Sequence, residues 1–282
     1  VAEVGKNVSG YDIGVPVTIT PMIPCRRCFY CTHDMENVCE NVSAVGYDIA
    51  GGLAEYMRIP ADAIEGGCLF AATQDLPSEQ LALTEPLSCC VYGQRRSPVE
   101  VDDVVLILGA GPIGIFHVQL ALLAGARTVI VSQRSEPRRR LAAEFGAHVV
   151  VDPVNEDLSA VVAEHTSGRG ADVIFVCIGV PALVDDALAL ARKGGRVNLF
   201  AGLAGKGLTE VQANLIHYNE LQVTGQTGSR RSDFATALDL IQTRRIDAER
   251  MITHRFPLRD VAEAIETVSR GEGTKVAVMP EL

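Results

Sequence analysis

The sequence predicts an α/β protein in which a doubly wound parallel sheet is joined to a second, β-rich domain. Three observations lead to this class. Short apolar runs alternate with helical segments from residue 101 onward, a glycine cluster follows the first of these runs, and four cysteines gather near the start of the chain. The chain of 282 residues is long enough for two domains, because a domain usually holds about 100–200 residues.

The composition is that of a globular protein without a basic surface. Apolar residues make up 48% of the chain and the formal charge is −10, which argues against disorder and against nucleic acid or an anionic membrane as partners. The longest apolar runs are strand-sized, far shorter than a membrane span. No signal peptide is visible and the cysteines do not form a disulfide framework, so we expect a cytoplasmic protein.

The alternation of strands and helices begins at residue 104. A helix between two strands requires a parallel sheet with right-handed crossovers. The expected strands cover residues 104–108, 128–132, 148–151, 172–178, 196–200 and 221–225. The expected helices between them cover residues 113–123, 136–145, 158–165 and 182–192.

The glycine cluster has the sequence Gly109-Ala110-Gly111-Pro112-Ile113-Gly114 and lies between an expected strand and an expected helix. In this G-x-G-x-x-G pattern the first glycine permits a tight turn and the second lets the backbone approach a pyrophosphate, while the third packs the helix on the strand. The helix N-terminus then faces the phosphates. The alternative is a flavodoxin-like domain that binds no dinucleotide, and the glycines argue against it.

The end of the second strand indicates which dinucleotide is bound. NAD sites place a carboxylate there for the ribose hydroxyls, whereas NADP sites use an arginine for the 2′-phosphate. This chain has Gln133 and Arg134 at that point and Arg138 one turn later, with no carboxylate at the strand end. We therefore expect NADP(H) to be favoured over NAD(H). The alternative is a solvated helix face, which is our interpretation of Arg139 and Arg140.

Cys25, Cys28, Cys31 and Cys39 are separated by two, two and seven residues. Zn²⁺ takes four thiolates in a tetrahedron, and such short gaps let a tight loop wrap around the ion. A site with four cysteine ligands has no open position, so the predicted role of this zinc is structural. An iron–sulfur cluster is the rival use of the spacing, and four unligated thiols are the trivial alternative. We expect His33, inside the loop, to be exposed.

Together these features resemble the zinc-containing medium-chain dehydrogenase/reductase family, particularly its polyol (sorbitol) and threonine dehydrogenase branch. The resemblance rests on the four cysteines, on G-G-L-A-E-Y from Gly51, on E-P-L from Glu85 and on the glycine cluster. It implies a GroES-like catalytic domain over residues 1–96, a Rossmann NAD(P)-binding domain over residues 97–228, and a return to the catalytic domain over residues 229–282. The return would contain helices 234–243 and 261–269 and strands 251–256 and 275–279.

The resemblance also implies that Glu85 is a ligand of a second, catalytic zinc. Taken by itself, Glu85 suits the first turn of a helix, where a carboxylate is stabilised by the dipole and a proline follows. At the ends of the later strands we expect further cofactor contacts from Cys177, Gly179, Gly225 and Gln226.

The catalytic zinc site is incomplete in this sequence. The family's other ligands, a Cys and the His of a G-H-E motif, precede a V-x-E-V-G strand, and here that strand is residues 1–5. We therefore expect an N-terminally incomplete catalytic domain that begins inside a strand, over residues 1–4. The other histidines do not replace the ligands: we expect surface or packing roles for His117, His148 and His165, and loop or strand-edge positions for His217 and His254.

Two functions of different class follow. The first is a zinc-dependent oxidoreductase that transfers a hydride between a secondary alcohol or polyol, or the corresponding ketose, and NAD(P). The second is a catalytically incompetent scaffold or sensor that binds zinc and a nucleotide. A zinc-independent quinone reductase fits poorly, since that branch lacks the four-cysteine loop. We expect a homodimer or homotetramer, with strand 221–225 as a plausible edge for pairing between subunits.

Overall fold

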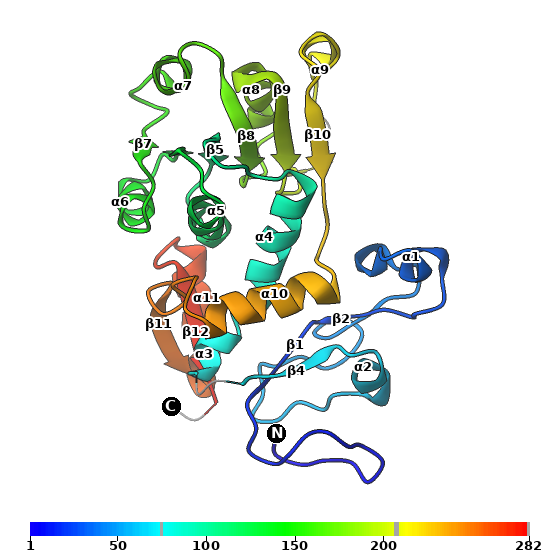
Figure 1. Cartoon of the computed structure of the whole chain (residues 1–282). Helices are drawn as coiled ribbons and strands as arrows, with labels where there is room; N and C mark the ends of the chain where they lie inside the picture. Colours follow the sequence, from blue (N-terminus) through cyan, green and yellow to red (C-terminus); the bar gives the residue numbers. More distant parts are fainter. Residues whose placement is uncertain (74–75, 206–208, 281–282) are drawn as a thin grey trace. The chain divides into compact units, whose positions relative to one another are not determined.

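The computed structural model describes residues 1–73, 76–205 and 209–280. The chain divides into two compact units (Figure 1). One unit combines Val1–Cys89 with Thr227–Leu282, and the other is the continuous stretch Cys90–Gln226. The first unit is therefore built from both ends of the chain. No helix among the described residues is long and apolar enough to cross a membrane.

The unit Cys90–Gln226 is built on a six-stranded parallel sheet with the strand order β10-β9-β8-β5-β6-β7. Its strands are β5 (Val104–Leu108), β6 (Thr128–Ser132), β7 (Val149–Val151), β8 (Ala171–Val176), β9 (Ala191–Leu199) and β10 (Gln222–Gly225). Its helices are α5 (Pro112–Leu123), α6 (Glu136–Glu144), α7 (Leu158–Thr166), α8 (Ala182–Leu190) and α9 (Ala213–Tyr218). The predicted doubly wound Rossmann sheet is confirmed.

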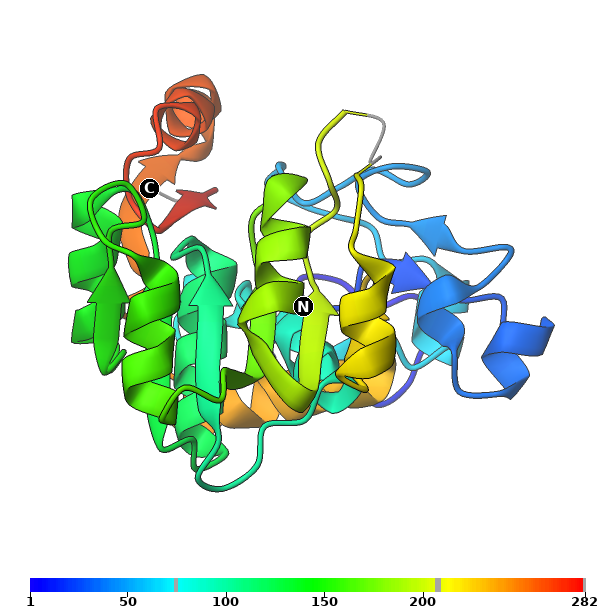
Figure 2. The same ribbon diagram turned by 90° about the horizontal axis from the view of Figure 1, so that it is seen from above.

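Helices cover both faces of this sheet. Figure 1 shows α5 and α6 on one face and α7 and α8 on the other. Figure 2 shows the strand arrows running the same way behind α7, α8 and α9. Because each chain crossover returns over the sheet, all strands end at one edge, and the turns after β5, β6 and β7 meet there.

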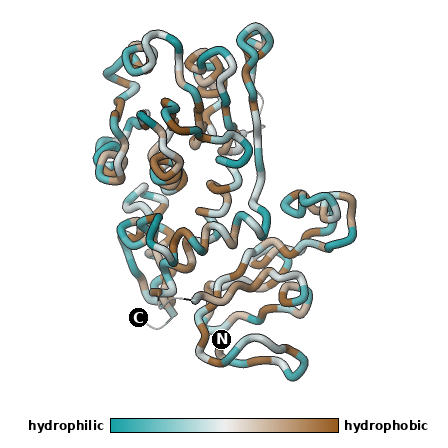
Figure 3. The backbone as a smooth tube through the Cα atoms, viewed as in Figure 1, coloured by the Kyte–Doolittle hydropathy of each residue, from teal (hydrophilic) through white to brown (hydrophobic). Residues whose placement is uncertain are grey.

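The core of this unit lies on the central strands. Every residue of β5 is buried, as expected for a parallel strand covered on both faces. Phe116 of α5 and Phe175 of β8 are among the largest fully buried side chains. Figure 3 shows hydrophobic colours in the central strands and in α5, whereas α6, with three consecutive arginines, is hydrophilic.

The junction of α8 and β9 differs from the prediction. The helix ends at Leu190, two residues before the expected end, and β9 begins at Ala191 rather than at Arg196. The pairing with β8 shifts register, since Ala171 opposes Ala191 while Val173 opposes Arg196. Gly194, with φ of 68°, permits the bulge that absorbs the extra residues.

The other unit has several small sheets instead of one large one. Strands β1 (Val17–Ile19) and β4 (Leu69–Ala71) pair antiparallel, as do β2 (Met22–Ile23) and β3 (Ser43–Ala44). Strands β11 (Ile252–Pro257) and β12 (Lys275–Met279) pair in parallel. The helices include α1 (Phe29–Thr32), α2 (Ala61–Glu65), α3 (Ser78–Leu81), α10 (Arg231–Gln242) and α11 (Val261–Ser269), with short 3₁₀ turns η1 (Glu36–Val38) and η2 (Leu258–Asp260). Helix α4 (Thr84–Arg96) runs from this unit into the other.

Two expectations about strands have different outcomes. The strand expected over residues 1–4 is wrong: these residues are not in a strand. Val1 only exchanges hydrogen bonds with the neighbouring loop, through its amino group to the Val15 carbonyl and its carbonyl to the Gly14 amide, each 2.8 Å long. Strand β10 lies at the edge of its sheet, and the pairing of subunits through it stays a prediction.

Candidate cofactor and zinc sites

The glycine turn connects β5 to α5. Gly109 has φ of 109°, and a Cβ at this position would overlap the side chain of Ile178. A Cβ on Gly114 would overlap the carbonyl oxygen of Gly109, so the third glycine is required for the helix to approach the turn. Both positions thus need glycine for reasons internal to the fold.

Gly111 is different, because no contact within the fold requires a glycine at this position. It caps α5 with an extended backbone, φ of −73° and ψ of −178°, which any residue can adopt. A Cβ here would meet no described atom within 4 Å. The open space in front of Gly111 lies at the N-terminus of α5, where Pro112 is the first helical residue. Such a helix end attracts anions, and the cradle fits the pyrophosphate of a dinucleotide.

The turn after β6 carries the two arginines expected to select the cofactor. Arg134 is exposed and Arg138, in the first turn of α6, is half-buried. Neither guanidinium has a hydrogen bond or ion pair with any residue in the described ranges. Two unpaired positive charges therefore stand at the edge where the second strand ends, and no carboxylate precedes them on that strand.

Arg139 does not lie on a solvated helix face, and that expectation is wrong. Its Nη1 donates hydrogen bonds to the carbonyls of Gln133 and Arg134, at 2.7 and 2.6 Å. Its Nη2 lies 3.1 Å from Oδ2 of Asp152, and the two side chains are 17% and 16% exposed. Asp152 directly follows β7, whose Val151 pairs with Ser132. Only the sheet order brings it here. Arg140 does lie on the surface, where it pairs with Glu136.

The remaining predicted cofactor residues lie at strand ends of the same sheet. The Gln133 side chain turns back on its own loop, where Oε1 accepts a hydrogen bond from the Ser135 amide at 3.1 Å. Cys177 follows β8, and desolvation raises the pKa of its thiol. Gly179 has no room for a Cβ because the carbonyl of Gly202 lies against it. Gly225 ends β10, and Gln226 accepts a hydrogen bond from Asn198 at 3.4 Å.

The four cysteines of the loop converge as predicted. The sulfur atoms of Cys25, Cys28, Cys31 and Cys39 all lie within 4.8 Å of one another. The amide groups of Cys25 and Asn41 each point at the Cys39 sulfur from 3.3 Å. Backbone N–H donors favour thiolates, and four convergent sulfurs are the donor set that tetrahedral Zn²⁺ takes. The chemistry and convergence of these sulfurs fit a zinc ion.

The thiols of this cluster titrate unequally. Backbone hydrogen bonds, first from Arg27 and then from Cys28, lower the pKa of Cys25 to about 6. Desolvation raises the pKa of Cys31 to about 12. His33 is exposed, as expected, and stacks on Phe29 with ring centroids 4.2 Å apart. It takes no part in the cluster.

The cysteine loop is held by the start of α10, which belongs to the same unit. The backbone N–H and Nε of Arg231 both donate to Oε1 of Glu36 at 2.9 Å, while Nη2 lies 3.2 Å from Oε2. Arg231 also donates to the carbonyl of Gly66. Burial would raise the pKa of Glu36, but the hydrogen bonds from Arg231 outweigh it, and the net shift is downward. A further bond joins Asn37 Nδ2 to the Thr227 carbonyl at 3.0 Å.

Glu85 lies in the first turn of α4. Its Oε1 accepts a hydrogen bond from the Cys89 thiol at 3.4 Å, one helical turn later. Nearby, the hydroxyls of Ser88 and Ser229 lie 2.6 Å apart. Within the described ranges, the cysteine cluster is the only group of three or more His, Cys, Asp or Glu side chains that could hold a metal ion. One carboxylate and one thiol do not make the three-ligand site of a catalytic zinc.

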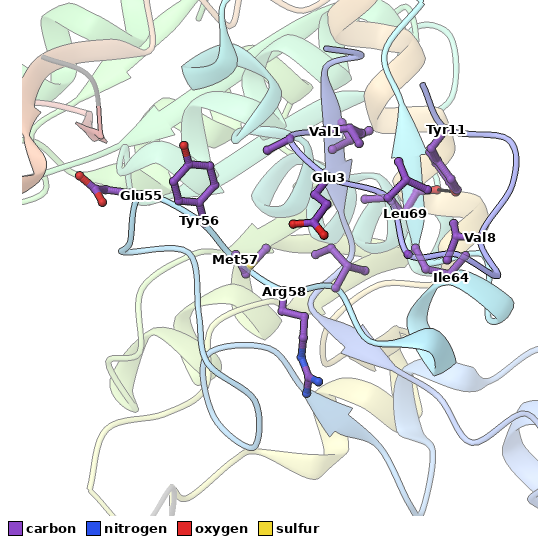
Figure 4. A pocket seen from close by; sticks show the side chains of 15 residues that line it. Val1, Glu3, Val8, Tyr11, Glu55, Tyr56, Met57, Arg58, Ile64 and Leu69 are labelled. Atoms are coloured by element: carbon purple, nitrogen blue, oxygen red, sulfur yellow. Dashed lines mark hydrogen bonds between the residues drawn. The ribbon is translucent and has the colours of Figure 1, made fainter. Parts of the chain in front are cut away.

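A hollow of about 1020 Å³ lies in the same unit, between residues 1–5 and 55–59. Apolar and polar side chains both line it. Figure 4 shows Val8, Ile64 and Leu69 together with Tyr11, whose hydroxyl donates to the Leu69 carbonyl at 3.0 Å. Neither Glu85 nor a cysteine lines it. We therefore assign it no catalytic role.

The histidines do not form a second metal cluster in the described ranges. His117 is a fully buried packing residue of α5, stacked on Phe175 with ring centroids 4.1 Å apart. The Nδ1 of His148 accepts a hydrogen bond from the Val129 amide at 3.0 Å, and His165 lies near the end of α7. His217 belongs to α9 and not to a loop, which corrects the expectation. His254 lies on β11.

Comparison with known proteins agrees with this architecture. The family model for alcohol dehydrogenase GroES-like domains matches residues 1–65, and the model for zinc-binding dehydrogenases matches residues 112–243. The L-threonine 3-dehydrogenase of Thermococcus kodakarensis is 34% identical over 99% of this chain and 79% of its own length. The D-arabitol-phosphate dehydrogenase of Enterococcus avium is 31% identical over 99% of this chain and 78% of its own length.

A solved structure extends the similarity to three dimensions. The crystal structure of a zinc-binding dehydrogenase from Sinorhizobium meliloti, bound to NADP, superposes with a TM-score of 0.91 at 35% identity. The match covers 99% of this chain and 81% of that one. The fold and the matches to the two family models define an oxidoreductase that binds a dinucleotide. More particularly, the chain belongs to the zinc-containing medium-chain dehydrogenase family, as the resemblance implied.

Proposed function

We propose that this chain is an NADP(H)-dependent oxidoreductase that transfers a hydride between a secondary alcohol or polyol and its cofactor. The observation that carries the proposal is the arrangement of residues at the carboxyl ends of strands β5 and β6. There the open backbone at Gly111 lies next in strand order to the unpaired guanidinium groups of Arg134 and Arg138. The NADP-bound relative from Sinorhizobium meliloti supports the choice of cofactor.

Different residues of the chain bind different parts of the cofactor. The N-terminus of α5 stabilises the pyrophosphate, because its unpaired N–H groups and positive dipole end face the anion. Arg134 and Arg138 pair with the 2′-phosphate, for which a guanidinium offers two parallel hydrogen bonds. The absence of a carboxylate at the end of β6 removes the repulsion that an NAD-type site would exert on that phosphate.

The substrate class rests on the relatives. One is named for threonine, a secondary alcohol, and another for arabitol phosphate, a polyol derivative. We propose that Glu85 is one ligand of the catalytic zinc, whose role when bound is to act as a Lewis acid on the substrate oxygen. Glu85 itself holds its carboxylate at the first turn of α4, with Cys89 beside it.

Cofactor titration tests the proposal directly. The dissociation constants of NADPH and NADH are measured by the quenching or enhancement of nicotinamide fluorescence. Replacement Arg134→Ala should weaken NADPH about tenfold, the loss of about 1.4 kcal/mol from a charge-assisted pair, and leave NADH within about twofold. Arg140→Ala, which removes a surface charge paired with Glu136, is the matched control. Equal losses for both cofactors would contradict the 2′-phosphate assignment.

Metal analysis and turnover separate the two classes of function. A zinc bound by the cysteine cluster should remain in Glu85→Gln and be lost in Cys28→Ser, whereas a second zinc should be lost in Glu85→Gln. A panel of secondary alcohols and polyols then tests NADPH formation. Bound NADPH and one zinc without turnover of any alcohol would favour the scaffold instead, an alternative supported by the single metal-ligand cluster of the described residues.

A further inference from the structure

The loop after β6 is held in place by a single side chain from α6. Arg139 bonds through Nη1 to two successive carbonyls, those of Gln133 and Arg134. The Gln133 side chain closes the same loop from the other end, through the Ser135 amide. The backbone that presents Arg134 is therefore fixed on both sides, although the Arg134 side chain is exposed.

The Nη2 atom of Arg139 faces the negative charge of Asp152, whose side chain is half-buried. Asp152 Oδ2 lies 3.1 Å from Nη2, and Asp152 also accepts hydrogen bonds from the Val154 amide and the Asn155 side chain, each 3.1 Å long. The Val154 N–H, the Asn155 amide and Arg139 together lower the pKa of Asp152, so the carboxylate is ionised near neutral pH. It is placed at the end of β7, the strand next to β6.

We propose that Arg139 is a positioning residue for cofactor selectivity: it fixes the loop that carries Arg134 and neutralises Asp152, so that the adjacent sheet edge accepts the 2′-phosphate of NADP(H). The inference rests on the proposed function. Arg139 itself donates hydrogen bonds to Gln133, Arg134 and Asp152 and does not bind the phosphate.

The charge balance explains why one arginine of the R-R-R run differs from its neighbours. A carboxylate without a positive partner would repel a phosphate dianion bound nearby. Arg140 cannot replace Arg139, because it extends to the surface and pairs with Glu136 at 2.9 Å. The two residues have the same chemistry, adjacent positions and different roles, which makes them a matched pair for experiment.

Binding of two cofactor fragments tests the inference without turnover. Adenosine 2′,5′-bisphosphate carries the 2′-phosphate and adenosine 5′-monophosphate does not, and calorimetric titration gives the ratio of their dissociation constants. We expect Arg139→Ala to lower the preference for the bisphosphate about five- to tenfold, with the monophosphate little changed. Arg140→Ala should keep the preference of the wild type. Asp152→Asn should keep or raise it, and the double variant Arg139→Ala/Asp152→Asn should recover part of the loss.

A second variant guards against simple unfolding. Arg139→Lys keeps the positive charge but replaces the planar guanidinium, with its several N–H donors, by a single ammonium group. This variant should therefore lose less of the preference for the bisphosphate than Arg139→Ala. If Arg139→Ala weakens both fragments equally, or if Asp152→Asn lowers the bisphosphate preference, the inference is wrong while the cofactor assignment stands. If the wild type itself shows no preference for the bisphosphate, the NADP(H) proposal fails and this inference fails with it.

Discussion

Individual glycines in the turn after β5 serve two purposes, and the structure separates them. Gly109 and Gly114 are required by contacts inside the fold, with Ile178 and with the Gly109 carbonyl. Gly111 has an ordinary extended backbone and open space in front of it. The same motif therefore contains two residues that the fold requires and one that leaves open space at the proposed cofactor site.

This difference predicts opposite effects for two similar substitutions. Gly111→Ala should leave thermal stability equal or slightly higher, since alanine fits the backbone and restricts the unfolded chain, but should weaken NADPH at least tenfold, or about 1.4 kcal/mol. Gly114→Ala should lower the free energy of unfolding by about 1–3 kcal/mol, because the new methyl group overlaps backbone. Thermal unfolding and NADPH titration of both variants check this. Normal NADPH affinity in a folded Gly111→Ala variant would refute the cradle.

His117 is the residue whose burial has a consequence for acid stability. It is fully buried, and neither ring nitrogen has a hydrogen-bond partner among the described residues. Desolvation lowers its pKa from 6.5 to about 3. The unfolded chain therefore binds a proton that the folded protein excludes between these values, and stability falls as the pH drops through this window.

We expect His117→Leu to remove the part of the pH dependence of the unfolding free energy that comes from protonation of this one histidine. Between about pH 6 and pH 4 the wild type should lose up to about 1.4 kcal/mol of unfolding free energy per pH unit from this group alone. Urea unfolding across that range gives the slope for each protein. The exposed His217 supplies the control, since His217→Gln should leave the slope unchanged. An identical slope in wild type and His117→Leu would show that the ring is protonated in the folded state.

At the scale of elements, the cysteine loop depends on a helix far along the chain. Its own elements, α1 and η1, are four and three residues long, too short to be stable alone. The loop is tied to the start of α10 by Arg231, which bonds Glu36 and the Gly66 carbonyl. Arg231 thus holds the loop on one side, and a metal ion bound by the four cysteines would hold it on the other.

Loss of this arginine should loosen the metal site without removing a ligand. We expect Arg231→Met to lower the free energy of unfolding by about 1–3 kcal/mol, because Glu36 loses its charged partner, and to speed the transfer of zinc to a chromogenic chelator. Glu65→Gln, which breaks the exposed pair between Glu65 and Arg26 at 3.2 Å, is the control and should change neither quantity appreciably. Equal release rates for all three proteins would mean that the loop holds its zinc without help from α10.

At the scale of the whole molecule, the unit with the continuous sequence was the one most accurately predicted. The strands over residues 104–108 and 128–132 have the expected bounds, because a buried parallel strand is apolar along its whole length and stands out from the helices beside it. The bulge after Ala191 was missed, since K-G-G in a strand carries no apolar signal.

The unit built from both ends of the chain was predicted less well in its details. Strands of two or three residues, such as β2 and β3, are too short for a pattern to identify, and the strand expected over residues 1–4 is absent. The cysteine spacing, in contrast, gave the metal cluster correctly, because ligand spacing is a local property of the chain.

The sequence by itself determined the family, the parallel sheet, the cysteine cluster and the glycine turn, because each depends on residues that lie close together in the chain. Only the tertiary structure decided what Arg139 does. Asp152 is thirteen positions away from Arg139 and becomes its neighbour because β7 pairs with β6. The tertiary structure likewise decided that Gly111 faces open space and that His117 is sealed in the core. Burial and charge pairing arise between distant segments, and a local pattern cannot record them.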